Sequence, residues 1–471
     1  MSAPHAALPR RALLIECCPY HEELFPAWRN MVADLGYRLD IAAIDGPPQR
    51  QVLAAMDPSG MEVYDVGRLH EVPLHQYAFV LLASVVHAGY GLNTPLLRER
   101  FGFVPEAPLP DLELLAELGL PSLAIVHEPL AWIEHRPIAC FELTRLGEER
   151  DEHCFLRFFD DGRWSADCLL DADADNPRQW IQRDGELQPL GDGGRGLRLS
   201  GIGLPRDLEP VSDDTYATQD RRTRLVRRNY RTPDLAAHLA GGRHAAATLS
   251  PGGQDYLRPL APDVEWLLPF ELVRGGPVQD SQIAIDATEF VYAAGIDYRR
   301  KALVELVDAV AATGQEIVMV GGTRDPEFDA DPHVRKLRHQ IAERGLEGHF
   351  HFTGHLEHGA FLDRVRRARF LLPLVDDLRD AGAYLTRLPA AVLLSLGFGV
   401  PMILDENLAR RLGLEMMITY AEGDLVGALE EARALDDSAY RDLRAAVVER
   451  AGEQRRRNRS TLAAILDRIL E

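Results

Sequence analysis

Two series of short apolar runs alternate with helix-patterned segments along this chain of 471 residues. The first series contains ALLIECC, RLDIAAI, YAFVLLASV and PSLAIVHE, and the second contains EFVYAAG, QEIVMVGG, HFHFTGHL and FLLPLV. Apolar runs of this length, separated by helices, are typical of buried parallel strands. We therefore predict an α/β fold of two Rossmann-like, doubly wound parallel sheets that face a cleft. The first domain spans residues 1–272, a Gly- and Pro-rich linker spans 273–283, and the second domain spans 284–454.

An interruption of this rhythm lies inside the first domain, at about residues 136–205. The runs IACFELTRLG, HCFLRFFDDGRWSADCLL and QWIQRDGELQPL contain the Asp-Gly turns DDGR and RDGE. Asp-Gly between such runs is typical of β-hairpins, so we predict an antiparallel β insertion. An Arg-rich helical stretch is expected to follow at about residues 213–241.

Charge and cysteine content narrow the classes of partner. The formal net charge of −21 argues against broad contact with nucleic acid or anionic lipid. The sequence contains no run of about 18 apolar residues, so we expect no transmembrane helix. The five cysteines form no CxxC pair, and no signal-peptide pattern is present. We therefore expect a cytoplasmic protein with reduced thiols.

One loop of the second half carries three cations where a strand gives way to a helix. In AAGIDYRRKA, Gly295 permits a tight turn, and Arg299, Arg300 and Lys301 fall near the N-terminus of the next helix. The helix dipole disfavours cations there unless an anion lies between them and the exposed amides. The loop therefore indicates a phosphate site, and a solvated basic turn is the alternative.

The other strand-end loops of this half are expected to line the same cleft, because ligands of doubly wound sheets bind at the carboxyl ends of the strands. Each of these loops is also compatible with a plain turn. The residues are Gly321 and Gly322 after IVMV, Gly354 and His355 in FTGHL, and Thr386 and Arg387 just before a helix expected to begin at Pro389.

The second half resembles the C-terminal domain of retaining GT-B glycosyltransferases of the GT4 type. The resemblance rests on GIDYRRKALVELVDAV, IVMVGG, HFTGHL, FLLPLV and LLSLGFGVPMI, and it covers roughly residues 245–450. It implies that Lys301, together with Arg299 or Arg300, holds the diphosphate of a nucleotide-sugar. AIVHEPL is similar to the loop in which a histidine faces the donor, which indicates His127. The amphipathic segment 455–471 is then expected to be a helix that crosses back to the first domain.

The stretch GAYLTRLPAAVLLSLGFGVPMIL departs from the family pattern. Aligning its GFGVP with the family's Gly-x-Pro corner places Thr386 and Leu394 where the family has two glutamates that bind the sugar and the ribose. Thr386 and Arg387 are still able to serve phosphates or sugar. Leu394 cannot bind a hydroxyl group, so the resemblance implies that ribose recognition differs or is lost.

The predicted function is transfer of a sugar from a nucleoside diphosphate sugar to a glycan, a protein or a lipid carrier. The resemblance implies a retaining hexosyltransferase that needs no metal and no cofactor, with His127, Arg300 and Lys301 in catalytic roles. Glu16, His21 and Glu22 in ECCPYHEE follow the first strand and are expected to line the acceptor side, or to be surface polar groups of a loop. A catalytically silent GT-B-like binding module and a sugar-nucleotide epimerase remain as alternatives.

Overall fold

The computed structural model divides the chain into two compact units. The two-sheet unit comprises Met1–Val85, Leu96–Leu130 and Asp234–Glu471, and the antiparallel unit comprises Val86–Pro95 and Ala131–Pro233. The structure describes residues 10–18, 21–56, 60–85, 119–127, 129, 137–146, 151–159, 163–170, 179–189, 197–199, 209–212, 215–228, 235–272, 288–298, 300–321, 331–375, 384–421 and 424–471. The predicted linker at 273–283 lies outside the described residues.

The first parallel sheet has seven strands in the order β15-β14-β5-β4-β1-β2-β3, and every neighbouring pair is parallel. The strands are β1 (Arg10–Glu16), β2 (Tyr37–Ala43), β3 (Val63–Asp65), β4 (Phe79–Val85), β5 (Ser122–Val126), β14 (His244–Thr248) and β15 (Glu265–Trp266). The described helices of this part are η1 (Glu22–Leu24), α1 (Phe25–Ala33), α2 (Pro47–Ala55), η2 (Val66–Glu71), η3 (Leu74–Gln76), α6 (Leu235–Leu239) and α7 (Pro251–Leu257). β5 is buried along its whole length, which explains its unbroken apolar sequence.

The second parallel sheet has the order β18-β17-β16-β19, and a bridge between Leu371 and Met402 extends it to the pair β20-β21. Its strands are β16 (Phe290–Ala293), β17 (Ile317–Val320), β18 (Phe350–Phe352), β19 (Phe370–Leu371), β20 (Ile403–Asp405) and β21 (Ile418–Tyr420). Its described helices are α8 (Leu303–Thr313), α9 (Pro332–Glu343), η5 (Glu347–His349), α10 (His358–Arg366), α11 (Ala390–Phe398), α12 (Glu406–Leu412) and α13 (Leu425–Ala434).

Helix α11 is formed by the stretch that departs from the family pattern. Pro389 is its N-cap with an extended backbone, so the helix begins at Ala390, one residue later than predicted. Gly399 ends it in the left-handed conformation, with φ of 63°, which glycine adopts without strain. All residues from Ala391 to Phe398 are buried. A helix covered on every side needs no polar face, which explains the continuous apolar sequence.

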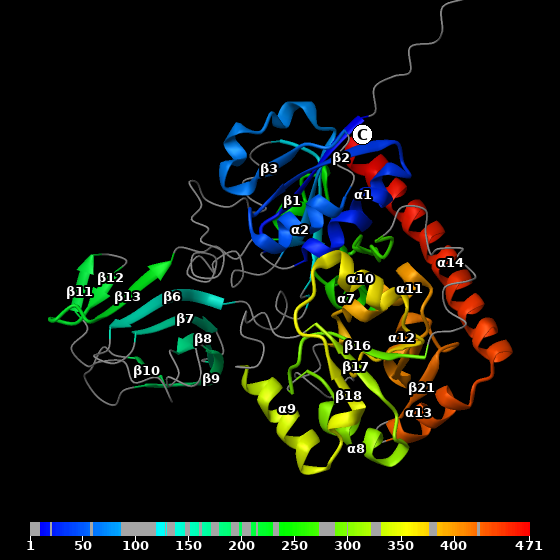
Figure 1. Cartoon of the computed structure of the whole chain (residues 1–471). Helices are drawn as coiled ribbons and strands as arrows, with labels where there is room; N and C mark the ends of the chain where they lie inside the picture. The colour runs from blue at the N-terminus through cyan, green and yellow to red at the C-terminus, as the bar shows by residue number, and fades with distance from the viewer. Residues whose placement is uncertain are drawn as a thin grey trace, which may run out of the picture. The chain divides into compact units, whose positions relative to one another are not determined.

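The last helix, α14 (Asp437–Leu470), is a single helix of 34 residues (Figure 1). The sequence predicted a break before a separate helix at 455–471, but residues 454–460 contain neither Pro nor Gly to stop the first one. α14 contacts segments that connect strands of the first sheet. Its Arg455 pairs with Asp34, after α1, at 3.0 Å and with Glu271, after β15, at 3.2 Å. Asn458 also donates its side-chain amide to Leu268 O at 2.6 Å.

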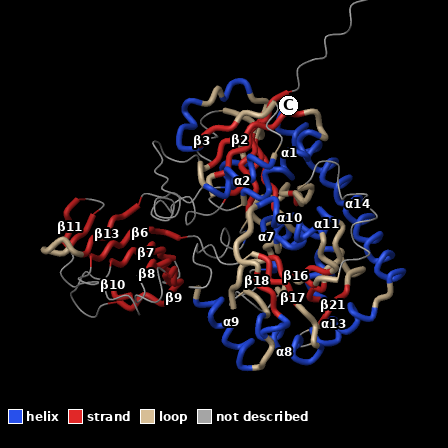
Figure 2. Tube along the Cα trace, viewed as in Figure 1, coloured by secondary structure: helices blue, strands red, loops and turns tan. Residues whose placement is uncertain are grey.

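The antiparallel unit contains one eight-stranded sheet in the order β10-β9-β8-β7-β6-β13-β12-β11, and its described elements are all strands (Figure 2). These are β6 (Pro137–Leu146), β7 (Asp151–Phe159), β8 (Arg163–Leu170), β9 (Gln179–Pro189), β10 (Leu197–Leu199), β11 (Glu209–Ser212), β12 (Thr215–Ala217) and β13 (Thr223–Arg228). The predicted antiparallel insertion is therefore confirmed.

Two details of that prediction were wrong. The pair in RDGE makes no turn, because Asp184 and Gly185 lie inside β9 and pair with Ser165 and Trp164 of β8. The sheet also continues to Arg228, where a helix was predicted from about residue 213. Arg224 is exposed and Leu225 is buried in β13, which is the alternation of a strand.

None of the helices in the described part of the chain combines the length and the apolar character that a membrane span requires.

Candidate functional site

The first candidate site lies where the strand order of the first sheet reverses. β1 lies between β2, the next strand of the chain, and β4. Such a reversal opens a crevice at the carboxyl ends of the strands, where ligands of open α/β sheets bind. Glu16 ends β1, Ser84 is the penultimate residue of β4, and His127 directly follows β5. Together with His21, these residues form the strand-end cluster.

Hydrogen bonds connect the strand-end cluster. Ser84 donates its hydroxyl to Glu16 Oε2 at 2.6 Å, and His21 Nδ1 lies 2.8 Å from Ser84 Oγ. The amide of Cys18 donates to Glu16 Oε1 at 2.7 Å. Because the serine hydrogen points to Glu16, neutral His21 carries its proton on Nδ1 and its lone pair on Nε2. Once Glu16 is ionised, this arrangement suits a proton acceptor whose developing charge is balanced by a carboxylate.

His127 packs against the ring of His21. The two ring centroids are 4.1 Å apart with an interplanar angle of 26°. His127 Nε2 lies 2.8 Å from Ala83 O, and because a carbonyl only accepts, this nitrogen carries the proton. The structure thus shows His127 fixing the position of His21. The predicted contact of His127 with the donor stays a prediction.

The backbone of His21 is held in an unusual conformation. Its φ of 103° and ψ of 11° lie in the left-handed region, which residues other than glycine seldom adopt. Such strain persists only where the surroundings impose it, and it is common at functional sites. His21 caps η1, which carries Glu22 and Glu23. Glu22 accepts a hydrogen bond from Gln49 at 3.4 Å. Its charge adds to burial in raising the pKa of Glu16, so all three predicted acceptor-side residues lie in one region.

Glu16 is a buried carboxyl group with 1% of its surface exposed. Burial raises its pKa to about 8, and the hydrogen bonds from Ser84 and Cys18 offset part of that rise. A folded-state pKa above the unfolded value stabilises the protein fully below about pH 4.5, and this contribution is lost as the pH rises through about 8. Near neutral pH, Glu16 therefore has a stability cost that a neutral side chain avoids.

We expect Glu16→Gln to raise the free energy of unfolding at pH 8 by about 1 to 3 kcal/mol, because glutamine carries no charge. Its oxygen is still able to accept from the Cys18 amide, and its NH₂ donates to Ser84 Oγ with the direction of that bond reversed. Thermal unfolding between pH 5 and 9 measures this effect, and the gain should vanish near pH 5. Asp40→Asn is the matched control, because Asp40 is equally buried but pairs with Arg11 at 2.6 Å. That variant should be less stable than the wild type. A Glu16→Gln variant with unchanged pH dependence would contradict the assignment.

Glu16, Cys18 and His21 also have the composition of a transition-metal site. One ligand atom from each lies within 4.8 Å of the others. Glutamate, thiolate and imidazole are ligands that suit Zn²⁺. Both Glu16 oxygens already accept hydrogen bonds within the cluster. The expectation that the protein needs no metal remains a prediction.

The second candidate site lies at the corresponding reversal of the second sheet. β16 lies between β17 and β19, and the loops that follow β16 and β19 meet there. Lys301, from the loop after β16, donates its ammonium to Pro373 O after β19 at 3.1 Å. It is 8% exposed. Burial, and secondarily the charge of Arg300, lower its pKa to about 8, while Asp297 acts in the opposite direction.

Lys301 also lies beside the turn that precedes α11. Its Nζ is 5.6 Å from the centroid of the Tyr384 ring, two residues before Thr386. Thr386 is 2% exposed, and Arg387 is half-buried. Ser250, the N-cap of α7, donates to Thr386 O at 2.6 Å. Two predicted phosphate-binding features, the lysine and the turn before α11, are thus neighbours in the structure.

Close packing of α7 fixes that turn. A Cβ added to Gly252 would lie 2.0 Å from Leu385 O, so only glycine allows the two backbones to approach this closely. The sequence motif SPGGQ therefore positions a loop more than 130 residues away. Neither Ser250 nor Tyr384 was among the predicted site residues, because nothing in a single sequence indicates which distant loop a glycine faces.

The remaining predicted donor-binding residues are distributed over the loops that follow β16, β17 and β18. Arg300 is partly exposed, and its Nε lies 3.6 Å from Asp297. Gly295 accepts a hydrogen bond from the Tyr292 hydroxyl at 2.5 Å. Gly321, with φ of 87°, follows β17, while Gly354, with φ of 66°, and the exposed His355 follow β18. The predicted Arg299 and Gly322 lie outside the described residues.

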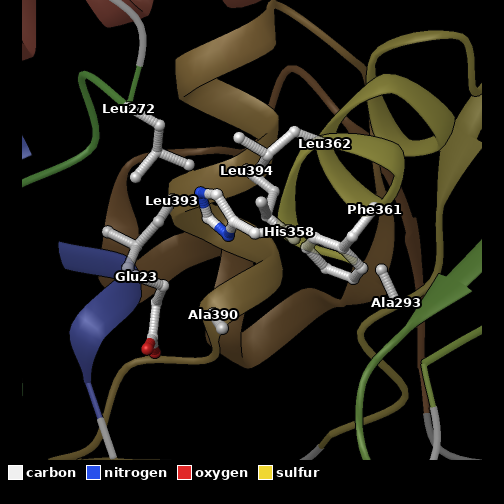
Figure 3. Close-up of a pocket in the computed structure, with 9 residues that line it drawn as sticks. All are labelled: Glu23, Leu272, Ala293, His358, Phe361, Leu362, Ala390, Leu393 and Leu394. Carbon is white, nitrogen blue, oxygen red and sulfur yellow. The ribbon is translucent and has the colours of Figure 1, made fainter. Parts of the chain in front are cut away.

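A pocket of about 170 Å³ lies at the end of β16, between α10 and α11 (Figure 3). Most of its lining is carbon, and Glu23 and His358 are the polar side chains among the described residues that line it. The described residues that line it are Glu23, Leu272, Ala293, His358, Phe361, Leu362, Ala390, Leu393 and Leu394. Leu394 is one of its apolar wall residues. The contributions of Glu23 and α10 were not predicted, because they come from elements far apart in sequence.

Comparison with solved structures shows the fold. The crystal structure of Anabaena Alr3699/HepE in complex with UDP-glucose has a TM-score of 0.50 at 10% identity, over 96% of this chain and 99% of that chain. The complex of the same protein with UDP and glucose also has a TM-score of 0.50 at 10% identity, over 97% and 99%. Sucrose-phosphate synthase from Thermosynechococcus elongatus has a TM-score of 0.42 at 15% identity, over 97% and 96%.

The predicted GT-B architecture, with two parallel sheets and an antiparallel insertion, is therefore confirmed at the level of the fold. No protein-family model and no curated protein sequence matches the chain. At such low identity, the likeness carries the fold alone.

Proposed function

We propose that this chain is a glycosyltransferase that moves a sugar from a nucleoside diphosphate sugar to an acceptor hydroxyl. The observation that carries the proposal is the buried ammonium of Lys301 beside the turn before α11, at the strand-order reversal of a GT-B fold. In the reaction, the bond between the anomeric carbon and the diphosphate breaks, and its electron pair leaves with the diphosphate. The acceptor oxygen forms the new bond and loses its proton.

The leaving diphosphate is the group that needs stabilisation. Lys301 supplies a positive charge in a site with little water, where a charge interacts more strongly than at the surface. Thr386 and Arg387 add a hydroxyl and a guanidinium just before the N-terminus of α11, and the helix dipole favours an anion there. These groups together replace a metal ion, which is the reason for proposing metal-independent transfer. Arg300 is the second cation of the loop.

The donor is proposed to be a UDP-sugar, and the transferred group a hexose. The Anabaena structures with a similar fold contain UDP-glucose, or UDP and glucose. The acceptor, a glycan, a protein or a lipid carrier, is proposed to approach the strand-end cluster at the end of β1. Glu23 lies two residues after His21 and lines the pocket with residues of α10 and α11, so the loop after β1 reaches the donor side.

Two stereochemical outcomes are compatible with this arrangement. The family resemblance favours retention, in which the departing diphosphate takes the acceptor proton. The hydrogen-bonded sequence His21–Ser84–Glu16 favours inversion, because His21 Nε2 is then available in the chemistry as a base. The anomeric configuration of the product, read by proton NMR coupling constants, decides between them.

A thermal-shift comparison of UDP, GDP, ADP and dTDP on the full chain tests the proposal. We expect UDP to raise the unfolding temperature by several degrees, since a ligand that binds only the folded state stabilises it. UDP-glucose is then incubated with and without a mixture of small glycans. Lack of response to all four nucleotides would support the silent binding module, and consumption of the donor by isomerisation without an acceptor would support the epimerase.

A further inference from the structure

The turn before α11 is held through the carbonyl oxygens of residues 384–386. Arg411 of α12 donates its guanidinium to Tyr384 O at 3.3 Å. Leu385 O lies against the backbone of α7, because a Cβ added to Gly252 would be only 2.0 Å from it. α7 and α12 are also neighbours. Two helices therefore fix the turn from the side of its carbonyl oxygens.

Ser250 makes the third of these contacts and is 3% exposed. Its Oγ accepts from the Gly253 amide at 3.0 Å, which caps α7, and donates to Thr386 O at 2.6 Å. A hydroxyl has one hydrogen and two acceptor lone pairs, so these two bonds use different parts of the same group. Because a carbonyl only accepts, the hydrogen of Ser250 is committed to Thr386. One side chain thus both begins α7 and holds the turn.

The bond from Ser250 also sets the direction of the peptide group that joins Thr386 to Arg387. This group is planar, and the described part of the chain has no cis peptide bond, so the amide of Arg387 points away from Ser250. Lys301 lies beside the same turn, with its Nζ 5.6 Å from the ring of Tyr384, so an anion is expected there. A carbonyl oxygen released from Ser250 is able to face that anion and to repel it. The held peptide keeps the turn attractive to a diphosphate.

We propose that Ser250 is a positioning residue of the donor site and that it holds the turn with Thr386 and Arg387 in the orientation that binds the diphosphate. The inference rests on the proposed function and extends its donor site to the segment after β14, a strand of the first sheet. Ser250 acts through Thr386 and not on the donor itself, because its one hydrogen is used in that bond. A substitution in this segment therefore changes donor affinity without removing any charge from the site.

Calorimetric titration of the full chain with UDP tests the inference on two variants. Ser250→Ala removes the hydrogen and should weaken UDP binding about tenfold, the usual effect of losing one buried hydrogen bond. Ser250→Thr keeps the hydroxyl and should bind UDP within about twofold of the wild type, because threonine is also an N-cap residue. The extended backbone of this position, with φ of −142° and ψ of 154°, suits a β-branched side chain.

Steady-state kinetics give a readout that a merely structural role would not change. UDP release from UDP-glucose, with water as the acceptor, measures both constants. In Ser250→Ala, KM for UDP-glucose should rise by the same factor as the dissociation constant of UDP, while kcat stays within about threefold. Partial unfolding alone would lower kcat and leave KM unchanged.

A second helix cap provides the matched control. Asp436 is exposed and caps α14, where it accepts from the Ala439 amide at 2.8 Å. The preceding Leu435 accepts from Arg369 at the amino end of β19, the edge of the sheet opposite to the site. Asp436→Ala should therefore lower the unfolding temperature, as the loss of a cap does, and leave UDP affinity unchanged. A tenfold loss of affinity in Asp436→Ala would overturn the inference, because a lost cap would then suffice.

The remaining results also have distinct consequences. Unchanged UDP affinity in folded Ser250→Ala overturns the inference and leaves the glycosyltransferase proposal standing, whereas a wild type that binds neither UDP nor UDP-glucose overturns both. An equal loss in Ser250→Thr overturns the inference too, because the hydroxyl is then not the cause. If Ser250→Ala fails to fold, Ser250→Gly replaces it, since glycine is a better N-cap residue than alanine and also lacks the hydroxyl. The same loss of about tenfold is expected there, and unchanged affinity overturns the inference.

Discussion

Replacing Lys301 by methionine is expected to weaken UDP binding at least about 100-fold while leaving the fold as stable as before or more stable. The ammonium is almost fully buried beside the turn before α11, so it has little contact with water and interacts strongly with an anion bound there. Methionine has a similar length and is apolar, so it fills the same space without the cost of burying a charge. Loss of binding together with retained stability distinguishes a ligand-binding lysine from a structural one.

As the pH rises, the titration of Lys301 should change the stability of the wild type and its affinity for UDP in opposite directions. Its pKa is lowered to about 8 from an ordinary value of 10.5. Between these pH values the unfolded chain holds the proton that the folded chain has released, so stability rises with pH in that window. UDP binding needs the charged form and should weaken as the pH rises above about 8. Both trends should disappear in Lys301→Met.

The chain offers an unusually clean control for this experiment. Lys336 is the other of its two lysines, is exposed, and packs over the ring of Tyr298 at 4.1 Å. Lys336→Met should therefore leave UDP affinity unchanged. With ¹³C-labelled lysine, the wild type gives two sets of ε-carbon signals, and the variants assign them. An ε-carbon of Lys301 that titrates at the ordinary value, or is insensitive to UDP, would contradict the phosphate assignment.

Sequence periodicity predicted the sheets because their strands are buried over nearly their whole length. β4, β5, β16 and β17 are apolar at almost every position, and such runs allow few other interpretations. The end of the insertion was harder to predict. In β13, TRLVRR alternates over only a few residues, and its arginines also suit an exposed helix face. The segment is a strand because it pairs with β6, and that pairing cannot be predicted from the local sequence.

The candidate site was predicted in its parts but not in its connections. The sequence indicated Lys301, Thr386, Glu16 and His21, because each follows a strand or precedes a helix. Ser84 was missed, although it lies between Glu16 and His21 and is hydrogen-bonded to both. A serine inside the apolar run YAFVLLASV is equally compatible with a buried polar residue that has no functional role. His358 was missed for a related reason. Its importance comes from the pocket opposite α10, and helix periodicity does not specify that partner.

Replacing His21 by glycine is expected to reduce the rate of sugar transfer by about 10² to 10⁴-fold without loss of stability or of UDP affinity. Glycine adopts the left-handed backbone of this position without strain, so the substitution removes the imidazole and relieves the backbone together. UDP release from UDP-glucose, with water or an added glycan as acceptor, measures the rate. Added imidazole should restore part of it, because a free base is able to enter the space that the side chain leaves.

The pH profile and a matched variant separate a base from a merely structural residue. Transfer by the wild type should rise with pH through about 8 as Glu16 ionises and, through Ser84, stabilises the protonated His21 ring. This rise should be absent in His21→Gly. Arg221→Gly also relieves a left-handed backbone, with φ of 59°, but in an exposed turn of the antiparallel unit, and should leave the rate unchanged. Full activity in His21→Gly would exclude His21 as the proton acceptor and leave that role to the departing diphosphate, as retention requires.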